Sequence, residues 1–100
     1  MTDTTLFDFR DGNGPVPAHR HANGGGWVAD TAYVAPSARV TRNASVYGFA
    51  KVFDSCVVSG RAKVCGRARL LDSVELCKDA IICDNALLCD AVKVFGANVH

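Results

Sequence analysis

The chain has 100 residues, of which 49% are hydrophobic and 21% are charged, and its formal net charge is +1. A chain of this length forms one small domain, and its near-average composition argues against general disorder. The small net charge gives no overall field to attract nucleic acid, and no apolar run approaches the roughly 18 residues of a membrane span. We therefore expect neither a nucleic-acid partner nor a membrane partner.

The cellular compartment follows from the N-terminus and the cysteines. The first residues lack the basic-then-apolar layout of a signal peptide. Five cysteines are an odd number, and they do not have the spacing of a secreted disulfide framework. The sequence therefore predicts reduced thiols and a cytoplasmic protein.

Residues 1–27 precede any regular pattern. Residues 6–9, Leu-Phe-Asp-Phe, alternate as a short strand does, so they could add one strand to a sheet or lay Phe7 and Phe9 over the open end of the following structure. Residues 11–14, Asp-Gly-Asn-Gly, are turn signals. We interpret residues 1–27 as an N-terminal cap and lead-in segment, and residues 28–100 as the main domain.

Two histidines of the cap are candidate metal ligands. His19 and His21 have the spacing that puts two imidazoles on the same side of a strand, and Zn²⁺ binds imidazole well. Two ligands do not complete a site, and the sequence places no third ligand beside them. We favour a structural role for both and predict no bound metal or other cofactor.

Residues 28–99 repeat every six residues. Each of the twelve hexads begins with an aliphatic residue, from Val28 to Val94, and the fifth position is small or β-branched in all but the last, where Asn98 stands. A period of six leaves the aliphatic positions on no single face of a helix. It suits short strands joined by bends, with the aliphatic side chains inward and the small residues at the bends. Stacked rungs then share one core.

This pattern of aliphatic, three unrestricted, small and unrestricted residues resembles the hexapeptide-repeat family. The resemblance implies an all-β fold, a left-handed parallel β-helix that is triangular in section, with three hexads per coil and about four coils. Residues 11–32 also resemble the opening of hexapeptide-repeat proteins from bacteria and their phages, which would place a phage-encoded chain in the host cytoplasm. The family includes acyltransferases, zinc enzymes and non-catalytic modules, so the fold does not define the activity.

With three hexads per coil, residues eighteen apart stack. Outward columns then hold Cys65 above Cys83, while Cys77, Cys83 and Cys89 fall on different faces and form no metal cluster. We expect Cys65 and Cys83 to remain reduced, because of the compartment and the ladder geometry. Cys56 takes a core position as a small hydrophobe.

Two charged clusters follow from the same stacking. Asp54, Asp72 and Asp90 share one column, where like charges repel unless solvent, hydrogen bonds or a cation intervene. We favour solvated corner residues, and repulsion alone predicts that Asp72→Ala is neutral or stabilising. Five basic residues of the middle coils could bind phosphate or an acidic partner, although we favour a solvated band spread over two or three faces: Lys51, Arg61, Lys63, Arg67 and Arg69.

The outward surface becomes apolar toward the C-terminus, which predicts an interface. The candidate interface residues are Leu71, Ile81, Cys83, Leu87, Cys89, Phe95 and Val99. Copies could associate side by side as a dimer or trimer, as related trimeric enzymes do, or end to end. Alternatively, the natural chain continues past His100 and covers the last strands.

The sequence favours a binding function over catalysis. Family enzymes usually carry a histidine on the coils as general base or zinc ligand, and no histidine lies between Val28 and Val99. We assign no catalytic residue. Our leading hypothesis is a non-catalytic structural or protein-interaction module that self-associates and binds a macromolecular partner. The alternatives are an acyltransferase-like or zinc-dependent enzyme assembled across a homo-oligomer, with His19, His21 or His100 at a subunit boundary, and a phage inhibitor of a host protein.

Overall fold

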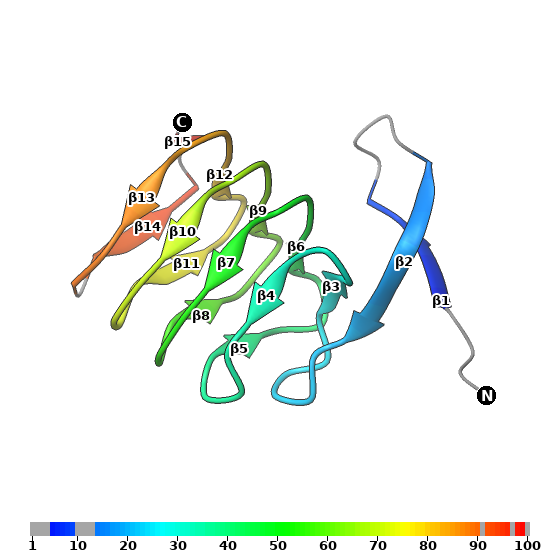
Figure 1. Cartoon of the computed structure of the whole chain (residues 1–100). Coiled ribbons are helices and arrows are strands. Elements are labelled where there is room, and N and C mark those ends of the chain that lie inside the picture. The colour runs from blue at the N-terminus through cyan, green and yellow to red at the C-terminus, as the bar shows by residue number, and fades with distance from the viewer. Residues whose placement is uncertain (1–4, 10–13, 91, 97, 100) are drawn as a thin grey trace.

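A computed structural model describes residues 5–9, 14–90, 92–96 and 98–99, and within these ranges the chain contains strands and turns but no helix (Figure 1). Three strands come first: β1 (Thr5–Asp8), β2 (Pro15–Arg20) and β3 (Trp27–Ala29). Strands of two or three residues follow at nearly regular intervals: β4 (Tyr33–Val34), β5 (Arg39–Val40), β6 (Ser45–Val46), β7 (Lys51–Val52), β8 (Val57–Val58), β9 (Lys63–Val64), β10 (Arg69–Leu70), β11 (Glu75–Cys77), β12 (Ile81–Ile82), β13 (Leu87–Leu88), β14 (Lys93–Phe95) and β15 (Asn98–Val99).

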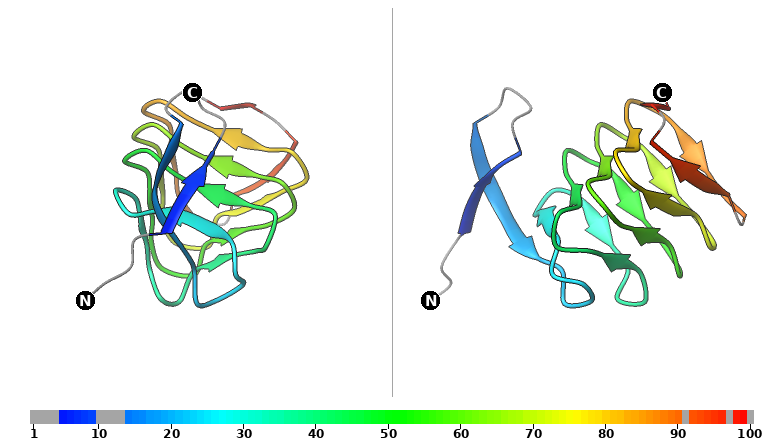
Figure 2. Two further views of the ribbon diagram at one scale, coloured as in Figure 1. Left: turned by 90° about the vertical axis from the view of Figure 1, so that its right-hand side faces the viewer. Right: turned by 180° about the vertical axis from the view of Figure 1, so that it is seen from behind.

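The strands form three sheets, and from β3 onward neighbouring strands in each sheet run parallel. The first sheet has the order β1-β2-β3-β6-β9-β12-β15, the second β13-β10-β7-β4 and the third β14-β11-β8-β5. Neighbouring parallel strands pair residues eighteen apart, as Lys51 with Arg69 and Val58 with Leu76 illustrate. The second sheet contributes one strand to each turn, so the chain is a parallel β-solenoid of about four turns (Figure 2). The predicted all-β coil is confirmed, and the predicted stacking register is confirmed for every parallel pair before β15.

The core lies between the three sheets and consists of the repeated aliphatic and small positions. Val46, Val64, Leu70 and Ile82 are fully buried, and the alanines at the bends pack beside them. Exceptions occur in the first and last turns, where Val34 and Leu88 are only partly buried and Val92 is 40% exposed. The hexad pattern therefore identifies the core correctly in the middle of the solenoid.

The corners of the solenoid have a backbone conformation that recurs every six residues. From Gly48 to Gly96, the third residue of each hexad has a positive φ, and four of the five residues other than glycine at these sites are aspartates. Glycine and aspartate tolerate this left-handed conformation, whereas Lys78, with a φ of 57°, has no such preference. The repeat imposes the corner geometry even where the residue does not favour it.

The N-terminal cap adds strands to the first sheet. β1 pairs antiparallel with β2, and β2 pairs antiparallel with β3. This hairpin lies at the end of the stack that begins with β3 (Figures 1 and 2). The sequence left open whether residues 6–9 add a strand to a sheet or cover the open end of the coil. In the structure, residues 6–8 belong to a strand that extends the first sheet.

The aromatic residues of the cap pack on the outward side of the first sheet and form a second, smaller core. The Phe9 ring stacks on Tyr47 with centroids 4.8 Å apart, and Phe7 stacks on Trp27 at 4.5 Å. Ala29 and Cys65 are buried in the same cluster. This outward column is therefore partly covered by the chain's own N-terminus.

Cys65 and Cys83 form a disulfide in this column. The prediction that both remain reduced is wrong for the structure. The eighteen-residue register brings their Cα atoms to 4.7 Å, within the range that a disulfide requires. Parallel ladder geometry therefore permits the bond.

The last rung departs from the predicted register. Ile81 pairs with Asn98 and Ile82 with Val99, a separation of seventeen residues. The predicted stacking of Val99 on Ile81 is therefore wrong by one residue. The departure falls in the one hexad whose fifth position, Asn98, is neither small nor β-branched, and it gives Val99 the register of the aliphatic core positions.

Candidate functional site

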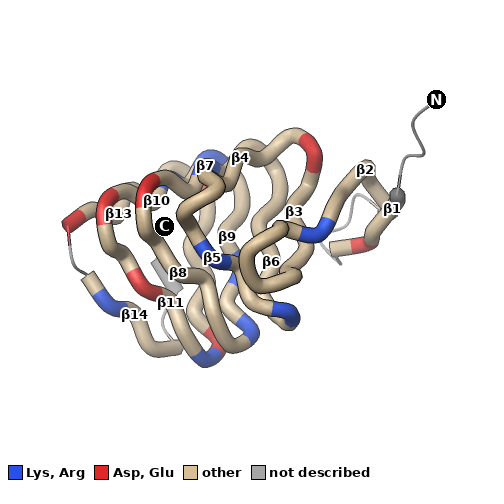
Figure 3. Tube along the Cα trace, turned by 90° about the horizontal axis from the view of Figure 1, so that it is seen from below, with Lys and Arg blue, Asp and Glu red and all other residues tan. Residues whose placement is uncertain are grey.

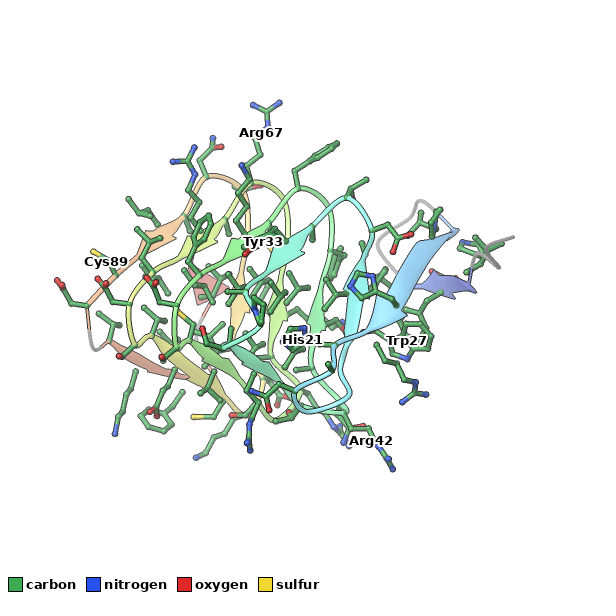
Figure 4. All side chains as sticks on the ribbon, turned by 60° about the horizontal axis from the view of Figure 1, so that its bottom comes forward. His21, Trp27, Tyr33, Arg42, Arg67 and Cys89 are labelled. Atoms are coloured by element: carbon green, nitrogen blue, oxygen red, sulfur yellow. A yellow bond between two sulfur atoms is a disulfide. The ribbon has the colours of Figure 1, made fainter. Side chains whose placement is uncertain are left out.

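Three basic side chains lie together at the edge between the first and second sheets. Lys51, Arg67 and Arg69 line a surface pocket of about 340 Å³ together with Thr31 and Phe49. All five side chains are exposed, and Arg67 projects away from the ribbon (Figure 4).

The repeat places these side chains. Lys51 and Arg69 are directly paired on β7 and β10, where each precedes a buried residue and therefore points outward. Phe49 and Arg67 each follow a corner glycine. A Cβ on Gly48 would lie 3.0 Å from the backbone of Gly66, so the bare corners let successive turns approach closely.

Backbone hydrogen bonds fix the spacing between the turns that carry the pocket. The Phe49 amide donates to the Gly66 carbonyl at 2.8 Å, and the Lys51 amide donates to Ala68 at 2.9 Å. The Thr31 hydroxyl donates to the Gly48 carbonyl. Thr31 therefore supports the wall of the pocket, and the cationic groups remain on its surface.

The pocket is electropositive. Lys51, Arg67 and Arg69 make no ion pair with any residue that the structure describes. Among those residues, the ion pair that occurs joins His19 and Asp30. Adjacent rungs lie only about 4.8 Å apart, so these like charges repel one another. Asp84 lines a neighbouring pocket with Arg67, and Asp30 lines another with Thr31 and Phe49. An anion at this edge would relieve the repulsion.

Aromatic side chains flank the cations. Phe49 is 63% exposed, and Tyr33, which pairs with Lys51 on the neighbouring rung, is 47% exposed. The Tyr33 ring lies 5.6 Å from that of Phe53. The second sheet therefore presents apolar ring faces beside a basic pocket.

The five basic residues singled out from the sequence separate into two groups. Lys51, Arg67 and Arg69 meet in the pocket, whereas Lys63 lies on β9 of the first sheet and Arg61 lies in the turn before it. Sequence reasoning missed Thr31 and Phe49. Their signal is the spacing of eighteen from Thr31 to Phe49 to Arg67, which stacks them in one column.

The two cap histidines have separate partners. The Nδ1 of His19 donates to Asp30 Oδ1 at 2.8 Å, and the Nε2 of the buried His21 donates to the Ala38 carbonyl at 2.9 Å. Asn23 donates to the same carbonyl. No group of three His, Cys, Asp or Glu side chains that could hold a metal occurs among the described residues. His100 lies outside them.

The aspartate column forms a hydrogen-bonded ladder. The Asp72 amide donates to a carboxylate oxygen of Asp54, and the Asp90 amide donates to Asp72 in the same way, each at 3.2 Å. Acidic positions at successive turns are visible beside β10 and β13 (Figure 3). The carboxylates of Asp54 and Asp72 therefore each accept a hydrogen bond from the backbone of the next turn.

The candidate interface residues are distributed over the three sheets. Leu71, Leu87 and Cys89 belong to the second sheet and its following turns, Ile81 and Cys83 to the first, and Phe95 to the third. Leu87 and Phe95 are 56% and 59% exposed, and the other four are half-buried. The side chain of Val99 lies outside the described residues.

The free cysteines differ in burial. Cys56 is buried in the core, while Cys77 and Cys89 are half-buried. Burial raises the pKa of the Cys56 thiol, and the charges of Asp54 and Asp72 add to this effect. Cys56 is therefore a neutral core residue.

Comparisons of the chain with protein-family models, with curated proteins and with solved structures found no significant match. The described part of the chain also has no helix that is long and apolar enough to cross a membrane. The chain's own side chains are therefore the basis for assigning its function.

Proposed function

We propose that the chain is a non-catalytic interaction module, a rigid β-solenoid that self-associates through the exposed apolar side chains of its last turn. The observation that carries this proposal is the exposure of Leu87, Val92 and Phe95, which are 56%, 40% and 59% exposed. They account for half of the strongly exposed large hydrophobic side chains among the described residues. Exposed apolar surface of this kind is typical of interfaces.

A second copy of the chain is the occupant that the arrangement favours. Leu87 lies on the second sheet, Phe95 on the third, and Val92 in the turn between them, so the three flank one edge of the solenoid. The same edge on another copy has the same rung spacing and the same apolar side chains. Burying them against each other contributes about 25 cal/mol per Å² of apolar surface. The resemblance to the hexapeptide-repeat family supports a dimer or trimer of this kind.

The histidines support a non-catalytic role. A general base must be free to reach a substrate proton, and a zinc ligand must offer a nitrogen lone pair. His21 is buried with its Nε2 on the Ala38 carbonyl, which takes it out of reach of a substrate. The exposed His19 donates its Nδ1–H to Asp30 and keeps the lone pair of its Nε2, but it belongs to no group of three His, Cys, Asp or Glu side chains among the described residues. Both side chains join the cap to the first turns of the solenoid.

Sedimentation velocity tests this proposal. We expect the unmodified chain to sediment as a dimer or trimer, and the double variant Leu87→Asp, Phe95→Asp to sediment as a monomer with an unchanged far-ultraviolet circular dichroism spectrum. Leu6→Asp is the matched control, because Leu6 is 60% exposed on β1, at the other end of the chain. A monomeric unmodified chain, or an assembly that survives the double substitution, would refute the proposal.

A further inference from the structure

We infer that the pocket at the edge between the first and second sheets binds a small phosphate ester. Lys51, Arg67 and Arg69 hold the phosphate, and Phe49 contacts the organic part. The pocket borders the proposed interface, because Arg69 pairs with Leu87 and these two residues line a neighbouring pocket with Arg67. The test below therefore follows self-association as well as ligand binding.

Charge identifies the anion. Three cations line one pocket without an ion pair to a described residue, and a doubly charged phosphate offsets more of their repulsion than a carboxylate does. The guanidinium groups of Arg67 and Arg69 can each donate two parallel hydrogen bonds to phosphate oxygens, and the Lys51 ammonium adds a point charge.

The size of the pocket and Phe49 identify an ester in preference to free phosphate. Sites for small organic molecules begin at about 300 Å³, and this pocket has about 340 Å³. A bare phosphate ion would leave much of that space to water, including the side lined by Phe49. The Phe49 ring is 63% exposed, and a planar organic group stacked on it would bury apolar surface.

The scaffold keeps the binding groups in place. Lys51 and Arg69 are paired across neighbouring strands, and the backbones of both turns are hydrogen-bonded to the next rung. Ligand binding therefore restricts side chains alone, which limits its entropic cost.

Isothermal titration calorimetry with three probes tests the inference: a purine nucleoside monophosphate, ribose 5-phosphate and inorganic phosphate. We expect the nucleotide to bind most tightly. Arg69→Ala should raise its Kd about ten- to hundredfold, the effect of losing a hydrogen bond to a charged group. Phe49→Ala should raise the Kd for the nucleotide but leave the Kd for inorganic phosphate unchanged.

The matched control is the double variant Arg61→Ala, Lys63→Ala, which removes two cations outside the pocket. It should bind the nucleotide as the unmodified chain does. Equal weakening by this control and by Arg69→Ala would indicate nonspecific attraction and overturn the inference. So would the absence of nucleotide binding at millimolar concentration, or equal affinity for nucleotide and inorganic phosphate. Sedimentation of each variant keeps these outcomes separate from any change in self-association.

Discussion

At the scale of single residues, Cys56 occupies a position that alanine fills in most of the other repeats. It is fully buried, and burial raises the pKa of its thiol above the ordinary value. The unfolded chain exposes this thiol and releases its proton at a lower pH than the folded chain does. The protonated thiol is therefore the form that the folded state favours.

This difference predicts a loss of stability in alkali. As the pH rises through the ordinary thiol pKa of about 8.5, the unfolded state ionises first, and the free energy of unfolding falls until the folded thiol also ionises. Cys56→Ala should therefore lose less stability than the unmodified chain between about pH 7 and pH 10. Urea denaturation across this range measures the difference.

Both chains in this comparison should carry Cys77→Ser and Cys89→Ser, so that no other free thiol attacks the Cys65–Cys83 disulfide. Parallel pH profiles for the two chains would contradict the assigned role of Cys56.

At the scale of an element, the aspartate corners show why charge repulsion alone is a poor guide. Asp72 has a φ of 65°, accepts a hydrogen bond from the Asp90 amide and donates its own amide to Asp54. An alanine at this site would lose the accepted bond and would adopt a left-handed conformation that costs about 1–2 kcal/mol.

We therefore expect Asp72→Ala to lower the free energy of unfolding by about 1–2 kcal/mol, in place of the neutral or stabilising effect that repulsion predicts. Asp72→Asn is the control, since its amide oxygen can accept the same bond and asparagine tolerates a positive φ. It should unfold in urea within about 0.5 kcal/mol of the unmodified chain. An alanine variant as stable as the asparagine variant would show that the ladder contributes nothing.

The elements differ in how far the sequence predicts them. The six-residue period determines the register of the stacked strands, because each rung must place its aliphatic residue inward. It also predicts that Lys51 and Arg69 stack, but Phe49 and Thr31 join them only through corner geometry. The positive φ of Lys78 is likewise not predictable from its residue type, because lysine does not favour the left-handed conformation. The packing of Phe9 on Tyr47 depends on how the hairpin folds back, which no local pattern encodes.

At the scale of the whole molecule, the chain is an elongated body of about 40 × 27 × 20 Å, and its two ends differ in structure. Its N-terminal hairpin covers part of the outward first sheet with aromatic side chains, including the column that carries the disulfide. Its last turn leaves Leu87 and Phe95 exposed. The exposure of these two side chains and of Val92 is the physical basis for proposing that copies associate through the last turn.

The solution mass of the unmodified chain is the most direct measure of self-association. Static light scattering over a dilution series, with and without a chelator, should give the mass of two or three chains, unchanged by the chelator, because apolar side chains and not a metal hold the assembly. A monomer at every concentration would contradict self-association. An assembly that dissociates in chelator would contradict the apolar interface and point to a metal at His19 and His21.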